Sequence, residues 1–316
     1  MTETDAPAVL ARGLTKRFGA FTAVDHVDLS IAKGEIVGFI GPNGAGKSTT
    51  IRMLCGLLRP GSGTARVAGY DVVEHPEAVR EHIGYMSQKF SLYGDLTVRE
   101  NLIFFGGLYR VPRRDIEERI RNAVTTAGLA GREDALVRTL AGGWKQRLAL
   151  GCAILHRPPV LFLDEPTSGV EPEARRRFWD LIHELASAGV TILVSTHYMD
   201  EAEYCNRIAL IDSGRIVAIG TPGELRQRHL GGTLYELECA ALGAALQALK
   251  QAPGVIDASI FGDKLHVLLE RAELAADLQP FLTRHGIGAG APQELRPSLE
   301  DVFVRVVSRP AAAQAA

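Results

Sequence analysis

Residues Gly41–Ser48 read GPNGAGKS, and this stretch decides the fold of the chain. It matches the pattern G-x-x-x-x-G-K-[ST] and lies between an apolar run, Glu35–Ile40, and a helical pattern, Ser48–Leu58. Glycines let the backbone turn inward, so that successive N–H groups can surround an anion at the start of a helix. The sequence therefore predicts a phosphate-binding loop between a buried strand and a helix, rather than a simple glycine-rich turn.

Two side chains at the end of this loop complete the predicted site. Lys47 would reach the β- and γ-phosphates of a nucleotide as a point charge, and the Ser48 hydroxyl would take one position in the octahedral shell of Mg²⁺. The residues expected to bind the nucleotide in this loop are Gly41, Pro42, Asn43, Gly44, Ala45, Gly46, Lys47, Ser48 and Thr49.

A second apolar run, Val160–Glu165 (VLFLDE), ends in two consecutive acidic residues. Carboxylates at the C-terminal end of a strand point into the crevice where parallel sheets hold their ligands. We expect Asp164 to hold Mg²⁺ through its waters, and Glu165 to polarise the water that attacks the γ-phosphate. Alone, such a pair is often an ordinary strand-to-loop turn, but beside a phosphate-binding loop it predicts a site for ATP and Mg²⁺.

The stretch Leu140–Gln146 (LAGGWKQ) resembles the signature of ABC ATPases, whose usual form is L-S-G-G-Q or L-S-G-G-x-x-Q. Other elements resembling those of the ABC cassette follow in order, and the set covers about 220 residues. No base-reading motif of the N-K-x-D type, typical of GTPases, is present. The matching positions are the aromatic Phe18, the Q-loop glutamine Gln88, the D-loop Ser168–Glu171 and the switch histidine His197.

The resemblance implies a role for each of these positions. Phe18 would stack on adenine, Gln88 would touch the metal or the attacking water, and His197 would bind the γ-phosphate. Taken singly, these residues read more often as a core aromatic, a surface amide and a loop histidine, and only their order favours the functional interpretation. The signature residues Ala141, Gly142, Gly143 and Gln146 would face the nucleotide of a partner cassette, which implies a homodimer or a heterodimer.

Two positions depart from the usual ABC pattern. Ala141 stands where the signature has serine, which removes a hydroxyl that could cap the helix, a loss of about 1 kcal/mol. Glu171 stands where the D-loop has aspartate and is one methylene longer. Because the catalytic residues Glu165, His197 and Gln88 and the metal-binding residues Ser48, Gln88 and Asp164 are present, we predict a slower but active ATPase.

The predicted fold class is α/β. Four nearly apolar runs suggest strands buried on both faces of a largely parallel sheet: Glu35–Ile40, Pro159–Leu163, Val190–Val194 and Arg207–Ile211. The resemblance adds antiparallel N-terminal strands. Helical periodicity along Val98–Tyr109 and Ile116–Leu129 predicts a helical insertion at about residues 88–140, followed by a helix over Arg147–Leu155.

A change of pattern after residue 221 predicts a second, smaller domain. We place the cassette at residues 1–230, an α+β domain at 231–309 and a disordered tail at 310–316. The domain boundary is expected near residues 229–232. Expected elements of the small domain are the strands Leu234–Cys239 and Lys264–Leu269 and the helices Ala241–Lys250 and Ala272–His285.

Composition limits the partners and the location of the protein. The net charge is only −2, which gives no basic field for nucleic acid. The four cysteines lack metal-ligand spacing, and no apolar run approaches the ~20 residues that span a bilayer. The start MTETDAPAVL lacks the layout of a signal peptide. We therefore expect a cytoplasmic protein that another subunit holds at the inner face of the cell membrane.

Two classes of function remain for an ABC ATPase: a transporter subunit, or a soluble regulator or machine component. The stretch Pro297–Val304 (PSLEDVFV) resembles the close of ATP-binding subunits in the ABC-2 export group, which includes daunorubicin-type and YbhF-type drug exporters. This resemblance favours an exporter with a separate, polytopic ABC-2 membrane permease, whose substrate the sequence leaves open. Hydrophobic residues within Ser91–Val111 suggest a groove for a short helix of that permease, although an ordinary helix core would account for some of the aromatic ones: Leu92, Tyr93, Phe104, Phe105 and Tyr109.

Overall fold

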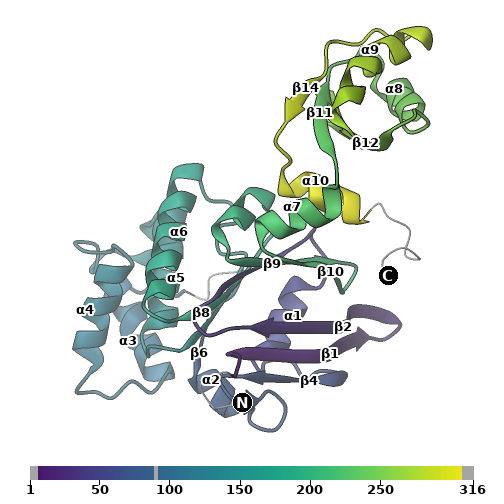
Figure 1. Ribbon diagram of the computed structural model, residues 1–316. Helices are drawn as coiled ribbons and strands as arrows, with labels where there is room; N and C mark the ends of the chain where they lie inside the picture. Colours follow the sequence, from purple (N-terminus) through teal and green to yellow (C-terminus); the bar gives the residue numbers. More distant parts are fainter. Residues whose placement is uncertain (1–5, 89–91, 308–316) are drawn as a thin grey trace. The chain divides into compact units, whose positions relative to one another are not determined.

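The computed structural model describes residues 6–88 and 92–307 of the chain. The chain forms two compact units, Met1–Ile219 and Gly220–Ala316 (Figure 1). We refer to the first as the cassette unit and to the second as the C-terminal unit. The predicted disordered tail at 310–316 lies outside the described residues.

A six-stranded sheet forms the centre of the cassette unit, in the order β10-β9-β3-β8-β7-β6. The pairs β3–β8, β3–β9, β6–β7 and β7–β8 are parallel, and β3, β7 and β8 consist entirely of buried residues. The predicted largely parallel, buried sheet is confirmed. The strands are β3 (Ile36–Ile40), β6 (Ile83–Met86), β7 (Val160–Asp164), β8 (Thr191–Thr196), β9 (Arg207–Asp212) and β10 (Arg215–Gly220).

An antiparallel sheet from the N-terminal part of the chain lies beside it, in the order β2-β1-β4-β5. Its buried residues share one core with β3 and with helix α1 (Lys47–Leu54), as Val9, Ile31, Phe39 and Leu54 show. The antiparallel N-terminal strands are therefore confirmed. They are β1 (Val9–Phe18), β2 (Phe21–Ile31), β4 (Ser62–Val67) and β5 (Tyr70–Asp71).

The predicted helical insertion contains two helices, α3 (Val98–Leu108) and α4 (Ile116–Thr126). A capping box at Thr97 and Glu100 begins α3. The apolar faces of α3 and α4 pack with α5 (Gly142–Ile154) into one core. The remaining helices of the cassette unit are α2 (Pro76–Glu81), α6 (Pro172–Ser187) and the short 3-10 helices η2 (Val137–Thr139) and η3 (Met199–Tyr204).

Two predicted helix boundaries were wrong. The helix predicted over Arg147–Leu155 begins at Gly142, because Ala141 is extended and its carbonyl accepts hydrogen bonds from the N–H groups of Trp144 and Lys145. The helix predicted to reach Leu58 ends at Leu54, shortly before Gly56, which has a φ of +65°. A left-handed glycine ends a helix at little cost.

The C-terminal unit contains a split βαβ arrangement. Its elements follow as β11-α8-β12-β13-α9-β14, and its sheet order is β12-β13-β11-β14 with antiparallel pairs. This is the ferredoxin-like topology. The elements are β11 (Thr233–Leu237), α8 (Leu242–Leu249), β12 (Val255–Phe261), β13 (Lys264–Leu269), η4 (Ala272–Leu274), α9 (Ala275–Arg284) and β14 (Gln293–Leu295).

The two faces of this sheet are covered differently. Alternate residues such as Leu237 and Val267 form a core with α8 and α9. The opposite face contacts α10 (Leu299–Val307), where Asp301 lies 2.6 Å from His266 and Arg305 lies 3.2 Å from Asp257. The end of the chain that resembles ABC-2 subunits is thus a helix held on the sheet by a hydrogen bond to His266 and an ion pair with Asp257.

The division between the units falls at Ile219 and Gly220, before the boundary near 229–232 that the sequence predicts. The reason is α7 (Pro222–Leu230), which begins with a capping box at Thr221 and Glu224 and packs against α10. A helix that buries its apolar face on α10 belongs to the C-terminal unit.

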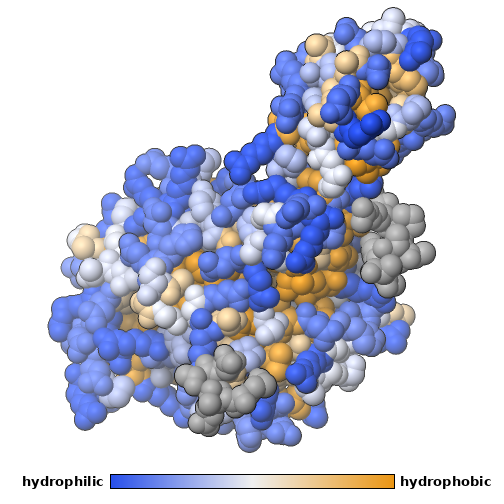
Figure 2. Space-filling view, viewed as in Figure 1, coloured by the Kyte–Doolittle hydropathy of each residue, from blue (hydrophilic) through white to orange (hydrophobic). Residues whose placement is uncertain are grey.

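The face of the molecule that Figure 2 shows is mostly polar. Hydrophilic side chains cover most of the face that Figure 2 shows, and hydrophobic residues gather in smaller patches. In the described part of the chain, no helix combines the length and the apolar character needed to cross a membrane.

Candidate active site

The phosphate-binding loop joins β3 to α1, as predicted. Its backbone requires glycine at two points. A Cβ on Gly41 would lie 2.0 Å from the carbonyl oxygen of Ile211, and Gly46, with a φ of +102°, would place a Cβ 2.4 Å from the carbonyl oxygen of Ala23. Both distances are too short for a side chain, so the loop can pass this closely only without one.

Lys47, the first residue of α1, is buried. Its Nζ donates hydrogen bonds to the carbonyl oxygens of Gly41 (2.7 Å) and Pro42 (3.0 Å) and lies 3.2 Å from Oε1 of Glu165. The side chains of Lys47 and Glu165 are only 3% and 6% exposed. Burying such charges is costly unless they are paired, and here each compensates the other.

Asp164 ends β7 and holds two hydroxyl groups. Its Oδ1 accepts hydrogen bonds from Oγ of Ser48 (3.0 Å) and from Oγ of Ser195 (2.6 Å). Burial raises the pKa of Asp164, and the nearby Glu165 adds to this, while the two hydroxyls and Lys47 oppose it. A cation placed at this carboxylate would favour its charged form.

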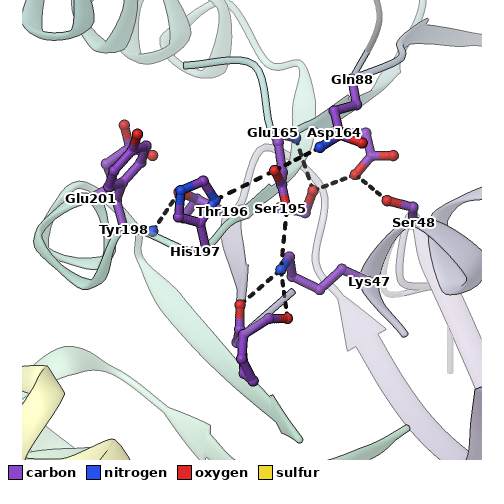
Figure 3. Close-up of polar contacts among 12 residues, drawn as sticks. Lys47, Ser48, Gln88, Asp164, Glu165, Ser195, Thr196, His197, Tyr198 and Glu201 are labelled. Atoms are coloured by element: carbon purple, nitrogen blue, oxygen red, sulfur yellow. Dashed lines mark hydrogen bonds and ion pairs between the residues drawn. The ribbon is translucent and has the colours of Figure 1, made fainter. Parts of the chain in front are cut away.

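Glu165 is the centre of the site (Figure 3). Its Oε2 accepts a hydrogen bond from Nε2 of Gln88 (3.0 Å) and lies 3.4 Å from Nδ1 of His197. Its backbone has a φ of +48°, unusual for a residue other than glycine, and its N–H donates to Oγ of Ser195. Strained backbone of this kind concentrates at functional sites, where the surroundings hold it in place.

Six residues predicted from separate motifs therefore meet in one place: Lys47, Ser48, Gln88, Asp164, Glu165 and His197. They come from α1, the segment after β6, the end of β7 and the segment after β8. The set combines a buried cation, two carboxylates, an amide and an imidazole. Such groups can bind phosphate and a hard cation and can accept a proton from water.

The other predicted site residues lie on separate elements. Phe18 ends β1 with its ring 51% exposed and with Nζ of Lys16 5.5 Å from the ring centre. Ala141 and Gly142 are exposed at the start of α5, Gly143 is half-buried, and Gln146 is buried. Glu171 precedes the first turn of α6. Their roles in nucleotide binding stay predictions.

Ser195 is a site residue that the sequence analysis missed. Its hydroxyl bonds both Asp164 and the N–H of Glu165, because β7 and β8 pair in parallel with Asp164 opposite Ser195. The signal was present: Ser195 directly follows the apolar run Val190–Val194 and lies two residues before His197. Aligning the ends of the two predicted strands would have placed it beside Asp164.

Comparison with known families assigns most of the chain. Residues 24–168 match the family described as ABC transporter, and residues 220–307 match the C-terminal domain described as ATP-binding protein DrrA1-3-like. Residues 145–199 also match a family described as an AAA domain, putative AbiEii toxin of a type IV toxin–antitoxin system. That third match covers only part of the cassette.

Three curated proteins show the relationship along the chain. The chain is 52% identical to the probable multidrug ABC transporter ATP-binding protein YbhF of Escherichia coli over 216 residues, which are 68% of this chain but only 37% of YbhF. It is 34% identical to the linearmycin resistance ATP-binding protein LnrL of Bacillus subtilis, over 95% of this chain and 98% of LnrL. It is 44% identical to the daunorubicin/doxorubicin resistance ATP-binding protein DrrA of Streptomyces peucetius, over 73% and 70% of the two chains.

Solved structures agree with this assignment. The ATP-binding subunit of an ABC transporter matches with a TM-score of 0.64 and 31% identity, over 70% of this chain and 92% of that one. A dimeric ATP-binding cassette bound to ADP and phosphate matches with a TM-score of 0.61 and 26% identity, over 67% and 98%.

The fold and the site thus define an ABC ATPase, a class whose domains bind and hydrolyse ATP. Within that class, the chain belongs to the family of ABC transporter ATP-binding proteins and carries a DrrA-like C-terminal domain. Subunits of this family work as dimers with a membrane permease.

Proposed function

We propose that this chain is the ATP-binding and hydrolysing subunit of an ABC-2 type exporter and works on a separate membrane permease. The observation that supports this most directly is the convergence of Gln88 and His197 with the buried residues Lys47, Asp164 and Glu165 in one site. The names of YbhF, LnrL and DrrA support drug export as the kind of transport, and the DrrA-like C-terminal domain supports the ABC-2 group.

Nucleotide binding begins with the phosphates at the start of α1. The backbone N–H groups of residues 43–49 and the Lys47 ammonium supply the positive charge there. Lys47 is paired with Glu165, so a phosphate that approaches Lys47 competes with this carboxylate. Binding would therefore release Glu165 from Lys47 and leave it free to act on water, while Phe18 would stack on adenine.

The donor set around Ser48 fits Mg²⁺. The Ser48 hydroxyl and the Asp164 carboxylate lie 3.0 Å apart and offer oxygen ligands, which this hard cation prefers. Among the described residues, no group of three or more His, Cys, Asp or Glu side chains is placed to hold a metal by itself. This suits an ion that binds through one carboxylate, one hydroxyl and the phosphates, where it neutralises the charge on the transferred group.

Glu165 is the proposed general base. Its carboxylate can accept a proton from water at the end of β7, and Gln88 and His197 hold it from two further segments. His197 would also bind the γ-phosphate and detect its loss. Ala141, Gly142, Gly143 and Gln146 at the start of α5 would act on the nucleotide of the second cassette, so ATP closes a head-to-tail dimer and hydrolysis opens it.

An apolar hollow on the cassette unit supports a contact with the permease. A cavity of about 440 Å³ lies between α2, β6 and α3, and its lining includes Leu57, Tyr85, Phe105 and Leu108. Nearby on α3, the exposed ring of Phe104 packs edge-on against Tyr93, with ring centres 4.6 Å apart. This surface is the proposed seat of a short cytoplasmic helix of the permease, which would hold the protein at the inner face of the membrane.

The substitution Tyr93→Glu tests this surface. Tyr93 is 48% exposed, so a charge there is tolerated by the fold but opposes an apolar partner. A tagged chain expressed in its native cell should co-purify with a polytopic membrane protein in mild detergent, and Tyr93→Glu should lose it. Ile260→Glu, at an equally exposed hydrophobic residue of the C-terminal unit, is the control and should keep it. If the wild-type chain and Ile260→Glu are both recovered only from the soluble fraction, the chain acts as a regulator outside transport.

A further inference from the structure

A buried acid that the proposed chemistry does not use lies beside the switch histidine. Glu201 belongs to η3, and its side chain is only 2% exposed. In Figure 3, His197 lies between Glu165 on one side and Tyr198 and Glu201 on the other. A carboxylate buried this deeply is expensive unless positive or polar groups surround it, so its surroundings indicate its role.

Groups from three other elements converge on Glu201. They are Thr167 of the loop after β7, Thr196 at the end of β8, and Arg175 and Trp179 of α6. Burial raises the pKa of Glu201, while all four of these groups lower it. Nη1 of Arg175 lies 3.9 Å from Oε1 of Glu201. Glu201 therefore lies beside the loop that follows Glu165, the strand end that precedes His197, and α6.

The hydrogen bonds among Glu201 and its polar neighbours are incomplete. Within the described chain, five of its buried polar atoms make no hydrogen bond of ordinary geometry: Oγ1 of Thr167, Nη1 of Arg175, Nε1 of Trp179, and Oε1 and Oε2 of Glu201. Thr167, Arg175 and Trp179 thus present N–H or O–H donors to one carboxylate, but outside ordinary hydrogen-bond geometry. A small shift of the segments can complete these bonds, which are worth most to a charged, buried acceptor.

Arg175 extends the cluster to His197. Its guanidinium lies over the ring of Tyr198 at 4.4 Å, and that ring lies 4.1 Å from the ring of His197. The backbone N–H of Arg175 also donates to the carbonyl oxygen of Glu171, the residue that matches the D-loop acid. The side chain of Arg175 thus contacts Tyr198 and Glu201, and its backbone bonds Glu171, so this residue joins the D-loop to the switch segment.

We infer that Glu201 is a positioning residue for ATP hydrolysis: it draws the loop at 167–171, α6 and the segment Thr196–Tyr198 together and so sets the orientation of His197 toward Glu165. The inference deepens the proposed function and rests on it. In this role Glu201 acts through His197 rather than on the nucleotide or the attacking water, so its loss should slow turnover without weakening ATP binding.

The substitution Glu201→Gln tests this role because it keeps the size of the side chain and removes its charge. We expect kcat for ATP to fall on the order of tenfold, with KM within about twofold of the wild-type value. The thermal stability should be kept or raised, since burial disfavours the carboxylate. Glu203→Gln, an exposed glutamate of the same 3-10 helix, is the matched control and should leave kcat unchanged.

A second readout needs no hydrolysis. The imidazole NMR signals of His197, recorded without nucleotide, should shift in Glu201→Gln and stay in place in Glu203→Gln. Wild-type protein without ATPase activity would overturn the proposed function, while this NMR comparison would still decide the inference. Unchanged kcat together with unchanged His197 signals in a folded Glu201→Gln protein would overturn the inference.

If Glu201→Gln does not fold, Arg175→Gln takes its place, because this side chain is partly exposed and links the same segments. The same selective loss of kcat and the same shift of the His197 signals would support the inference. Wild-type values of both in folded Arg175→Gln protein would contradict it.

Discussion

Asp164 is a buried carboxylate, and burial of its charged form is unfavourable for the fold. The residue sits at the end of a buried strand, where burial raises its pKa, and two serine hydroxyls and Lys47 recover only part of the lost solvation. The charged form of Asp164 is therefore more stable with a bound cation than in the nucleotide-free protein. The residue therefore links metal binding to the stability of the cassette.

The substitution Asp164→Asn should stabilise the nucleotide-free protein at neutral pH. A raised pKa means that the folded state binds the proton more tightly than the unfolded state, so this stability is present below the ordinary pKa of 3.8 and is lost as the pH rises through the folded value. Thermal unfolding between pH 4 and 8 should show a higher Tm for Asp164→Asn at pH 7 and a smaller difference toward acid.

The same experiment with Mg²⁺ and ATP supplies the control. Ligand binding raises the Tm of the wild-type protein, and it should raise that of Asp164→Asn less. A wild-type protein that is more stable than Asp164→Asn at pH 7 without nucleotide would contradict the assigned cause of the pKa shift.

At this scale, contiguous motifs were easier to predict than contacts across the sheet. Lys47 and Ser48 belong to one motif, and Asp164 and Glu165 to another, so each pair could be recognised from its neighbours in the sequence. Ser195 contacts Asp164 only because of strand register, and Glu201 has neighbours from α6, the loop after β7 and the end of β8. Neither relationship is visible in local sequence.

At the scale of the element, α5 shows what the signature substitution changes. Ala141 precedes the helix in extended conformation, with φ −64° and ψ 158°, and provides no side-chain cap. The geometry is that of a capping residue, but the hydroxyl is missing. The start of the helix was predicted too late because two glycines follow Ala141, and glycine is a poor helix former.

The substitution Ala141→Ser should restore the cap. The serine oxygen would accept a hydrogen bond from a free N–H of the first turn and raise the free energy of unfolding by about 1 kcal/mol, or the Tm by about 2–4 °C. Thermal unfolding checks this, with Ala141→Val as a control that adds volume without an acceptor. If Ala141→Ser and Ala141→Val have the same Tm, the capping argument is wrong.

Ala141→Ser should also raise the ATPase rate, since serine is the usual residue of the signature. Unchanged turnover in Ala141→Ser, together with wild-type hydrolysis no higher than that of Glu165→Gln, would remove the basis for predicting a slow but active enzyme.

At the scale of the whole molecule, the α/β cassette was predictable and the C-terminal topology was not. Buried strands such as Ile36–Ile40 carry their own signal as continuous apolar runs. In the C-terminal unit, β12 has only one buried residue and β14 has only three residues, so neither was predicted. The ion pair of α10 with β12 and its hydrogen bond with β13 also depend on chain segments that are distant in sequence.

Each predicted nucleotide site combines the phosphate-binding loop of one cassette with the signature residues of another. The chain should therefore dimerise when ATP binds. Glu165→Gln protein, which binds but does not hydrolyse, should elute from gel filtration as a dimer in the presence of Mg²⁺ and ATP, and as a monomer without them. Lys47→Ala, which lacks the phosphate-binding ammonium, should elute as a monomer in both cases. A Glu165→Gln protein that stays monomeric with ATP would contradict the homodimer.

Whether Glu165 is the general base for ATP hydrolysis is tested most directly by phosphate release. It is measured with Mg²⁺ and ATP for the wild-type chain and for Glu165→Gln at equal protein concentration. If Glu165 is the general base, wild-type protein releases phosphate steadily and Glu165→Gln is slower by about a hundredfold or more, while both bind nucleotide. Equal rates in the two proteins would show that the buried site around Glu165 is not where ATP is hydrolysed.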